Sequence, residues 1–387
     1  MQTARPSRAR VVGVDVVRGL AILGMFTAHL ADRDALLVRE GQSWFVAVDG
    51  RSAAGFALLA GVSAALLSGG SHPYVGARMQ HSRVRVLVRA LLLWPLGAAM
   101  IALKTPVIVI LPTYTLLFAV MAAVLHWSQR RLLITSAVVL AVAPPLVLLA
   151  RDHIYSSSTY PIQLVDITVG HFYPAGIWIA CLLVGLAVGR MDLCEPETPR
   201  RLIVWGGIAA VTGLGTNAIA MRTIDLSHTL RRALLTSEPH SSSAVELVAN
   251  IGVVLVVLGL CLIAAERFPR AVSPVAATGA LALTSYCGHL IAISAMGPEV
   301  VFEPSNLRLA CFIVVTLAVT WLWRTLLGRG PLERALHVAS TSVADRVVPA
   351  GRRPTHPSAV EDVPHQGDRP AGRRPRTRAG FRADGRP

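Results

Sequence analysis

The chain has 387 residues, of which 53% are hydrophobic and only 15% are charged, and its formal net charge is +15. A soluble domain carries about 25% charged residues, so this composition excludes an ordinary soluble enzyme and a mostly disordered chain. The five scattered cysteines exclude a disulfide-bonded secreted scaffold. The positive charge does not indicate nucleic-acid binding, because the arginines collect at the ends of apolar runs, as membrane topology requires.

Apolar stretches long enough to cross a bilayer recur along most of the sequence. A helix needs roughly 20 apolar residues to span the membrane, and the candidates are 12–30, 52–69, 84–103, 106–126, 131–150, 173–190, 201–220, 243–265, 273–295 and 307–328. Pro106 and Pro112 are expected to interrupt the fourth stretch. The sequence therefore predicts an all-α fold, a polytopic transmembrane bundle of about ten helices.

Basic residues lie in every second connection between these stretches. They are Arg5, Arg8 and Arg10; Arg78, Arg83 and Arg85; Arg130 and Arg131; Arg190, Arg200 and Arg201; and Arg267 and Arg270. Cytoplasmic loops carry the excess of Lys and Arg, so both termini are expected in the cytoplasm. The connection between the seventh and eighth stretches is an exception, since it also contains arginines.

Three regions follow from this pattern. Residues 1–11 are expected to form a basic cytoplasmic N-terminus, residues 12–330 the membrane domain, and residues 331–387 a cytoplasmic, largely disordered basic tail. Lys104 is the only lysine, a bias that indicates a GC-rich genome. The expected location is the plasma membrane of a bacterium with such a genome.

The first stretch contains ionisable residues, each of which costs about 2.5–3.5 kcal/mol within a span on insertion scales. Asp15 precedes Arg18 by three positions, within ion-pair reach on a helix. His29 follows Arg18 by eleven positions, so both lie on one helical face, about 16 Å apart along the axis. A buried orienting pair and an interfacial histidine would also explain these residues, but the shared face favours a functional path.

The spacing Arg18-x10-His29 in a first membrane helix resembles the Arg-x10-His motif of the acyltransferase-3 family. Longer strings are more similar to a neighbouring group, the YeiB-like proteins and bacterial relatives of heparan-alpha-glucosaminide N-acetyltransferase. These strings are GVDVVRGLAILGMFTAHL, VDGRSAAGFALLAGVSAALLSGG, GALALTSYCGHLI and RGPLERAL. The resemblance extends over about residues 10–337.

This resemblance implies a transmembrane acyltransferase. Such an enzyme moves an acyl group, with acetyl as the first expectation, from cytoplasmic acyl-CoA to a hydroxyl or amine of an envelope glycan, an extracytoplasmic glycan or a metabolite. Acyl-CoA is then a cosubstrate, and no bound cofactor is expected. The lysosomal enzyme carries a histidine in a His-Ala-x-Trp stretch before its second helix, whereas residues 40–55 here contain none. The histidine implied by the acyltransferase-3 pattern is His29, and Arg18 and Asp15 on the same helix are further catalytic candidates.

A histidine suits this chemistry, because transfer to a hydroxyl or amine needs a base near the acceptor or a nucleophile that carries the acyl group. His289 in the ninth stretch is a second catalytic candidate, with Ser285 and Tyr286 about one helical turn before it. His29 and His289 are both expected in the outer half of the membrane, where they could face one cavity. A hydrogen bond within the bundle would also explain His289.

Two groups of residues are candidates for substrate binding. Arg83, Arg85 and Arg89 begin the third stretch on the cytoplasmic side, where the phosphates of acyl-CoA require cations. Arg83-Val84-Arg85 also resembles an Arg-x-Arg motif of acyltransferase-3 proteins, although topology alone would explain Arg83. The acceptor-side candidates, expected near the outer face, are Asp49, Arg51, Ser285 and Tyr286.

Other classes of function have less support. The sequence has no Walker loop, no nucleophile elbow and no Cys/His spacing typical of a metal site. A proton-coupled secondary transporter that uses the Asp15, Arg18 and His29 face is the main alternative. It would usually show an internal repeat, and we find no partner for the first stretch in the second half. A scaffold without chemistry would tolerate substitution of His29 and Arg89.

Overall fold

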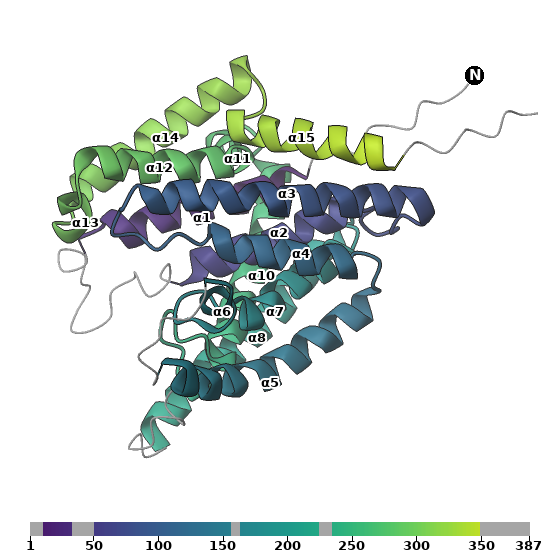
Figure 1. The fold of residues 1–387 in the computed structure, drawn as a ribbon, viewed down its shortest axis with the longest axis vertical. Coiled ribbons are helices and arrows are strands. Elements are labelled where there is room, and N and C mark those ends of the chain that lie inside the picture. Colours follow the sequence, from purple (N-terminus) through teal and green to yellow (C-terminus); the bar gives the residue numbers. More distant parts are fainter. Residues whose placement is uncertain (1–10, 33–49, 156–162, 224–233, 349–387) are drawn as a thin grey trace, which may run out of the picture. The chain divides into compact units, whose positions relative to one another are not determined.

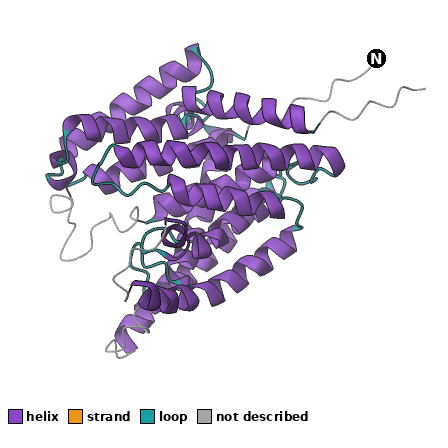
Figure 2. Ribbon diagram, in the orientation of Figure 1, coloured by secondary structure: helices purple, strands orange, loops and turns teal. Residues whose placement is uncertain are grey.

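The computed structural model describes residues 11–32, 50–155, 163–223 and 234–348, and within these ranges every regular element is a helix (Figure 2). The expected all-α fold is therefore confirmed for this part of the chain. Asp49 and residues 349–387, which make up most of the predicted tail, lie outside the described residues.

Each predicted apolar stretch corresponds to a helix or to the pair α11–α12, and α6, α13 and α15 are additional helices (Figure 1). Their bounds are α1 Val12–Leu30, α2 Arg51–Leu67, α3 Gly76–Ala102, α4 Leu111–Val124, α5 Gln129–Tyr155, α6 Gln163–Val169, α7 Ala175–Val188, α8 Glu197–Thr223, α10 Ala244–Arg267, α11 Ser273–Ala280, α12 Ala282–Met296, α13 Glu299–Phe302, α14 Asn306–Leu326 and α15 Pro331–Val347.

Six of these helices, α1, α3, α5, α8, α10 and α14, are long and apolar enough to cross a membrane, or seven if the bent pair α11–α12 counts as one span. The shorter apolar helices α2, α4 and α7 have 10–17 residues. Large apolar side chains on the long helices are exposed, among them Val211 on α8 at 73% and Val314 on α14 at 64%. Such faces suit contact with lipid. The count of ten spans stays a prediction.

Hydrogen bonds between helix termini define two ends of the bundle. At the proximal end, where α1 begins, Arg190 after α7 donates to the carbonyl oxygens of Gly70 after α2 and Leu125 after α4. At the distal end, where α1 ends, Ser305 N donates to Leu30 O at 3.0 Å. Helix α1 therefore begins at the proximal end, where α2, α4 and α7 end. The orientation of these ends relative to a membrane stays a prediction.

The core lies around α1, α2 and α7, which bury side chains such as Phe26, Leu58 and Trp178 completely. Helix α1 also packs against α11 at backbone distance. A Cβ atom added to Gly279 would lie 1.8 Å from Asp15 O, and one added to Gly19 would lie 2.0 Å from Val275 O. Only glycine permits this approach, which fixes α1 and α11 against each other.

Three local features refine the predicted elements. Pro112 lies in the first turn of α4, which begins at Leu111, so the expected interruption near the prolines is confirmed. The ninth stretch is not one straight helix, because α11 and α12 meet at Leu281 with an angle of 81°. Residues assigned to the tail from residue 331 onward include helix α15, which packs along α3 (Figure 1).

Candidate functional site

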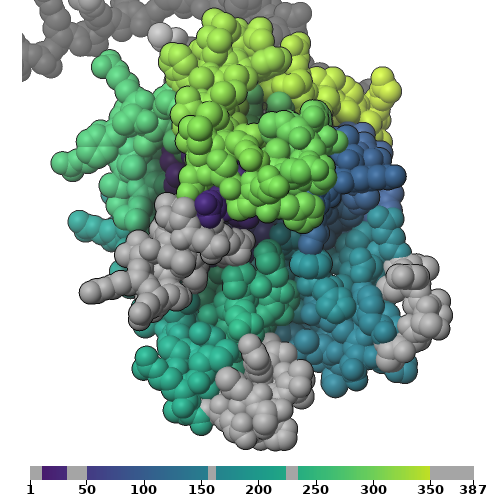
Figure 3. Space-filling model, turned by 90° about the vertical axis from the view of Figure 1, so that its left-hand side faces the viewer, coloured from purple at the N-terminus to yellow at the C-terminus, as the bar shows by residue number. Residues whose placement is uncertain are grey.

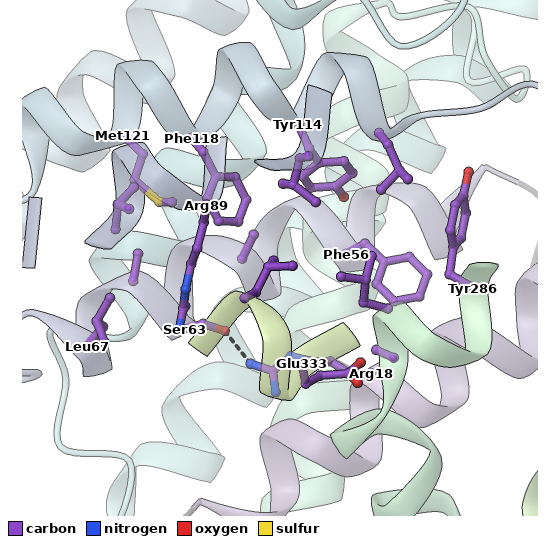
Figure 4. Close-up of a pocket in the computed structure, with 18 of the residues that line it drawn as sticks. Arg18, Phe56, Ser63, Leu67, Arg89, Tyr114, Phe118, Met121, Tyr286 and Glu333 are labelled. Carbon is purple, nitrogen blue, oxygen red and sulfur yellow. Dashed lines mark hydrogen bonds between the residues drawn. The ribbon is translucent and has the colours of Figure 1, made fainter. Parts of the chain in front are cut away.

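A central cavity of about 330 Å³ lies between α1, α2, α3, α4, the α11–α12 bend and α15 (Figure 4). Most of its lining is apolar. The polar side chains in the lining are Arg18, Ser63, Arg89, Tyr114, Tyr286 and Glu333. The cavity thus gathers residues that are far apart in the sequence, and it contains two of the predicted arginines.

Charged and aromatic side chains alternate around the cavity: Phe118 lies beside Arg89, and Arg18 and Glu333 lie on the same side as Phe56 (Figure 4). Helix α2 contributes both Phe56 and Leu67 to the lining, and eleven helical positions correspond to about 16 Å. Arg89 lies toward Leu67, near the proximal end, whereas Tyr286 lies toward Phe56. A long, narrow molecule with an anionic head would fit this distribution of charge.

Asp15 and Arg18 form the predicted ion pair. Arg18 Nη1 lies 2.7 Å from Asp15 Oδ1, and Asp15 is buried. Arg18 also donates to Ser63 Oγ on α2, while Ser63 Oγ donates to Leu59 O. The pair therefore orients the Arg18 guanidinium into the wall of the cavity. Asp15 can thus act as a buried orienting partner while Arg18 takes part in a functional site.

Glu333 is a charged residue of the cavity that sequence reasoning did not select. Its carboxylate accepts hydrogen bonds from Thr284 N at 3.0 Å and Thr284 Oγ1 at 2.6 Å. Thr284 lies in the first turn of α12, where a carboxylate satisfies unpaired N–H groups and the helix dipole. Glu333 thus joins α15 to the start of the helix that carries Tyr286 and His289. The motif RGPLERAL contained it, but its partner lies 49 residues earlier.

The three arginines predicted to bind acyl-CoA point in different directions. Arg89 lines the central cavity. Arg85, one turn earlier on the same face, lies beside α15, with Nη2 3.4 Å from His337 Nδ1. Arg83 turns toward the end of α4, where its Nη2 lies 2.7 Å from His126 Nδ1 and 3.4 Å from Ala123 O. The structure therefore groups Arg85 with Arg89 and separates Arg83 from them.

The proximal mouth of the cavity is strongly positive. The pKa of His337 lies below its ordinary value because the ring is partly buried and because Arg329, Arg85 and Arg89 lie nearby. The Nε atoms of Arg85 and Arg89 are buried and have no hydrogen-bond partner among the described residues. Unpaired, desolvated guanidinium atoms beside further cations are suited to a polyanionic ligand.

His29 and His289 form a direct pair at the distal end of α1. His29 Nδ1 lies 3.1 Å from His289 Nε2, and the two rings stack with an interplanar angle of 11°. His289 Nδ1 lies 2.9 Å from the carbonyl oxygen of Tyr286. A carbonyl only accepts, so we assign the proton of a neutral His289 to Nδ1. Its Nε2 then accepts from His29 Nδ1, which leaves the lone pair of a neutral His29 on Nε2.

The residues grouped with His289 lie on two sides of α12. Tyr286 lines the central cavity, and Ile110 N donates to its hydroxyl oxygen at 3.3 Å. Ser285 and His289 instead line an apolar cavity of about 550 Å³ between α12 and α14. The spacing of Ser285 and Tyr286 from His289 predicts that all three lie on one face of α12. Ser285 and His289 do line the same cavity, whereas Tyr286 lines the central one.

Two other predicted residues lie apart from the central cavity. Arg51 is the first residue of α2, at the distal end. Asp49 lies outside the described residues, so its proximity to the site is not defined. Tyr114 was not in the predicted site, yet it lines the central cavity with a buried hydroxyl that has no hydrogen-bond partner among the described residues. Among those residues, no group of three or more His, Cys, Asp or Glu is placed to hold a metal ion.

Ionisable side chains inside a bundle of apolar helices, such as the arginines of the central cavity and the His29–His289 pair, mark functional sites. The family model "Heparan-alpha-glucosaminide N-acetyltransferase, catalytic" matches residues 10–221, which is more than half of the chain. The protein belongs to this family, as the resemblance of its first helices indicated. A comparison with curated proteins gave no match. His289 and Glu333 lie beyond the matched residues, so their relation to the site comes from the structure alone.

Proposed function

We propose that this protein is a transmembrane acyltransferase that takes an acyl group, acetyl in the simplest case, from acyl-CoA at the proximal end of the bundle. The acceptor is a hydroxyl or amine of an extracytoplasmic glycan or metabolite at the distal end. The match to an N-acetyltransferase catalytic family supports acetyl transfer. The arginine-rich proximal end supports a cytoplasmic orientation for that end, and about ten crossings of the bacterial plasma membrane would fit this topology.

The central cavity is the observation that carries this proposal. Its proximal part contains Arg89 beside Arg85, which suits the phosphates of CoA. Its apolar length suits the narrow pantetheine arm, and its distal part ends at Tyr286, whose ring centroid lies 6.0 Å from that of His289. A donor bound with its nucleotide at the proximal mouth would therefore present its thioester close to the histidine pair.

The histidine pair then supplies the base. His29 Nε2, with its lone pair, takes the proton from the acceptor hydroxyl or amine as the acceptor attacks the thioester carbonyl. The acyl C–S bond then breaks, and CoA leaves as the thiol with the proton that His29 returns. His289 Nε2 accepts a hydrogen bond from His29 Nδ1 and so fixes the orientation of the His29 ring. The third residue of a catalytic triad orients the base in the same way. Charge that develops on His29 is stabilised because His289 is itself anchored on Tyr286 O. A nucleophilic role, in which His29 carries the acyl group, would use the same nitrogen.

The test combines donor binding and transfer in the same preparation. Purified protein in detergent is titrated with acetyl-CoA by calorimetry, and sealed vesicles that contain the protein receive acetyl-CoA labelled in the acetyl group on the proximal side. We expect His29→Ala to bind acetyl-CoA as wild type does but to transfer no label to acceptors on the distal side. His72→Ala, which removes an exposed histidine from the α2–α3 connection, is the matched control and should behave as wild type.

The outcomes separate the proposed function from its alternative. Absence of acetyl-CoA binding by a folded, monodisperse sample would refute the acyltransferase proposal. The proton-coupled transporter would then be examined through uptake into vesicles under a pH gradient. Retention of transfer by His29→Ala would keep the transferase but remove His29 as its base, and His289→Ala would be tested in the same assay.

A further inference from the structure

An apolar groove runs along α12, on a different side of this helix from the central cavity. It is the cavity of about 550 Å³ between α12 and α14, and we call it the lateral groove. Its lining extends from Thr284 to Met296 on α12 and from Cys311 to Trp323 on α14. Twelve helical positions on each side correspond to about 18 Å, close to the roughly 15 Å of hydrocarbon in one leaflet of a bilayer. The lateral groove therefore has the length of one lipid chain.

The lateral groove opens on a surface of the bundle that suits contact with lipid. Helix α14 forms much of the upper surface in Figure 3, and only Leu309 and Thr320 among its residues are buried. Val315 and Val319, which line the groove, are 59% and 55% exposed. An empty groove would lose the dispersion contacts of its walls, and water in it would lack hydrogen-bond partners. A hydrocarbon chain is therefore the occupant that these walls favour.

One polar atom indicates that the occupant carries an oxygen as well as a chain. Ser285 lines the lateral groove and is only 8% exposed, and its Oγ has no hydrogen-bond partner among the described residues. Buried hydroxyls are normally hydrogen-bonded, and an unpaired one is costly in an apolar medium. Two neighbouring hydroxyls of the lining are already paired, since Thr284 Oγ1 donates to Glu333 and Thr320 Oγ1 bonds to Thr278 Oγ1. Ser285 Oγ is therefore available to donate to a carbonyl oxygen, such as that of a lipid ester.

The two ends of the lateral groove differ, which gives a bound lipid a direction. At the proximal end, Trp323 Nε1 donates to Arg329 O at 3.2 Å, and Arg324 lies in the last turn of α14. Tryptophan is enriched at the level of lipid headgroups, and arginines at that level attract lipid phosphates. At the distal end the lining consists of side chains such as Met296 and Cys311, and the described lining includes no Asp, Glu, Lys or Arg. The phosphate therefore fits the proximal end, with the chain directed toward the distal end.

A chain in this direction would pass the histidine pair. His289 lines the lateral groove one helical turn beyond Ser285, and its ring stacks on that of His29. Phe312, which also lines the groove, lies edge-on to Phe26, whose ring centroid is 5.1 Å from that of His289. A chain anchored at Ser285 therefore packs against the aromatic side chains around His289 and keeps water away from them.

We propose that the lateral groove binds one acyl chain of a phospholipid from the leaflet at the proximal end. The ester carbonyl of that chain accepts a hydrogen bond from Ser285 Oγ in the first turn of α12, and the phosphate lies near Arg324 and Arg329. If the proposed function holds, the bound chain forms the lipid-side wall of the histidine pair. The binding itself does not depend on acyl transfer, because it requires neither donor nor acceptor.

The test is photolabelling of the full-length protein in phosphatidylcholine vesicles that contain a small fraction of a phosphatidylglycerol with a diazirine in one acyl chain. Labelled peptides are identified by mass spectrometry. We expect the label to concentrate on the groove-lining residues of α12 and α14 rather than on the lipid-exposed face of α8, where lipids exchange without a specific contact. Labels spread evenly over the exposed helices, or absent from α12 and α14, would overturn the proposal.

Filling the groove gives a matched pair of variants. A Cβ atom added to Gly288, which lines the groove, has no heavy atom within 4 Å, and the same holds for Gly207 on α8. Gly288→Leu therefore places a side chain in the lateral groove without a backbone clash, and Gly207→Leu makes the same change elsewhere on the membrane domain. We expect Gly288→Leu to lose the label on α12 and α14 and Gly207→Leu to keep it. Equal labelling of the two variants would refute the assignment.

The anchor is tested by Ser285→Ala, which should reduce labelling of the groove about fivefold through the loss of one hydrogen bond. Ser294→Ala removes another hydroxyl of α12, outside the groove lining, and should label as wild type does. Wild-type labelling of Ser285→Ala would refute the ester contact and with it the proposed orientation of the lipid.

A second copy of the chain over the groove is the competing occupant. It would exclude the lipid probe and bring two Cys311 thiols together, so bismaleimide cross-linking is measured in Cys194→Ser, which removes the other exposed cysteine. A Cys311 cross-link without lipid labelling would overturn the proposal. Labelling of the groove in a protein that does not bind acetyl-CoA would refute the proposed transferase and leave the lipid site in place.

Discussion

Arg89 and Arg83 provide a matched test of the donor site, because they lie on the same helix and differ in direction. Arg89 lines the central cavity and has a buried Nε without a partner among the described residues. A hydrogen bond to a charged group contributes about 1.5–3 kcal/mol, which corresponds to about 10- to 150-fold in Kd. We therefore expect Arg89→Gln to weaken acetyl-CoA binding by that factor.

Arg83→Gln makes the same change of charge six residues earlier, where the guanidinium contacts His126 and Ala123 O. Arg83 also has a buried Nε without a partner among the described residues, but it does not line the central cavity. We therefore expect its effect to stay below about threefold at physiological ionic strength, where salt screens charges that the ligand does not contact. Calorimetry with acetyl-CoA, repeated with a donor analogue that lacks the nucleotide, measures both effects. The loss in Arg89→Gln should shrink for the truncated donor. Equal effects of the two substitutions, or no effect of either, would refute the assignment of the phosphates to this end of the cavity.

Three further predictions concern residues around this site. Glu333→Ala should lower the free energy of unfolding by about 1–3 kcal/mol, because Thr284 N and Oγ1 lose their acceptor. Unfolding in mixed micelles measures this change. An unchanged free energy would show that the hydrogen bonds between Glu333 and Thr284 do not stabilise the fold. The pKa of His337, which burial and neighbouring arginines lower, should rise when CoA phosphates neutralise those cations, so donor binding should tighten as the pH falls through that pKa. NMR titration of His337 with and without CoA tests this, and identical curves would exclude phosphates at the proximal mouth. Arg190→Gln should cost about 3 kcal/mol of stability, because its buried guanidinium bonds to the ends of α2 and α4. The exposed Arg201→Gln should cost less than about 1 kcal/mol, and similar losses in both variants would contradict this interpretation.

The fold was largely accessible from the sequence because membrane helices obey strong, local rules. Apolar length predicted most of the long helices within a few residues, although α3 begins eight residues before the predicted stretch, and Pro112 indicated where α4 begins. Helix α15 was missed because its sequence is polar enough to suggest a disordered tail. The bend at Leu281 was not predicted, since Pro274 and Gly279 are also compatible with a continuous helix. The bend depends on the close packing of α11 against α1, which a single sequence does not encode locally.

The site was accessible only in part. The i, i+3 spacing predicted the Asp15–Arg18 pair, and the outward placement of two helices predicted that His29 and His289 come near each other. Helical periodicity alone would have placed Arg83 on a different face from Arg85 and Arg89. We grouped the three because Arg83 and Arg85 form the Arg-x-Arg motif. Glu333 was missed because its interactions are long-range, and nothing in the local pattern of α15 identifies its partner.

The glycine contacts between α1 and α11 have a mechanical consequence. Because Gly19 and Gly279 leave no space between the two backbones, α1 and α11 cannot slide past each other without a clash, and α12 continues from α11. Arg18 on α1 is therefore held at a fixed position along α11, and the contact of His29 with His289 extends this connection to α12. Sliding between α1 and α11 is thus excluded as a way to open the central cavity, whose other walls are α2, α3, α4 and α15, with α3 packed against both α4 and α15.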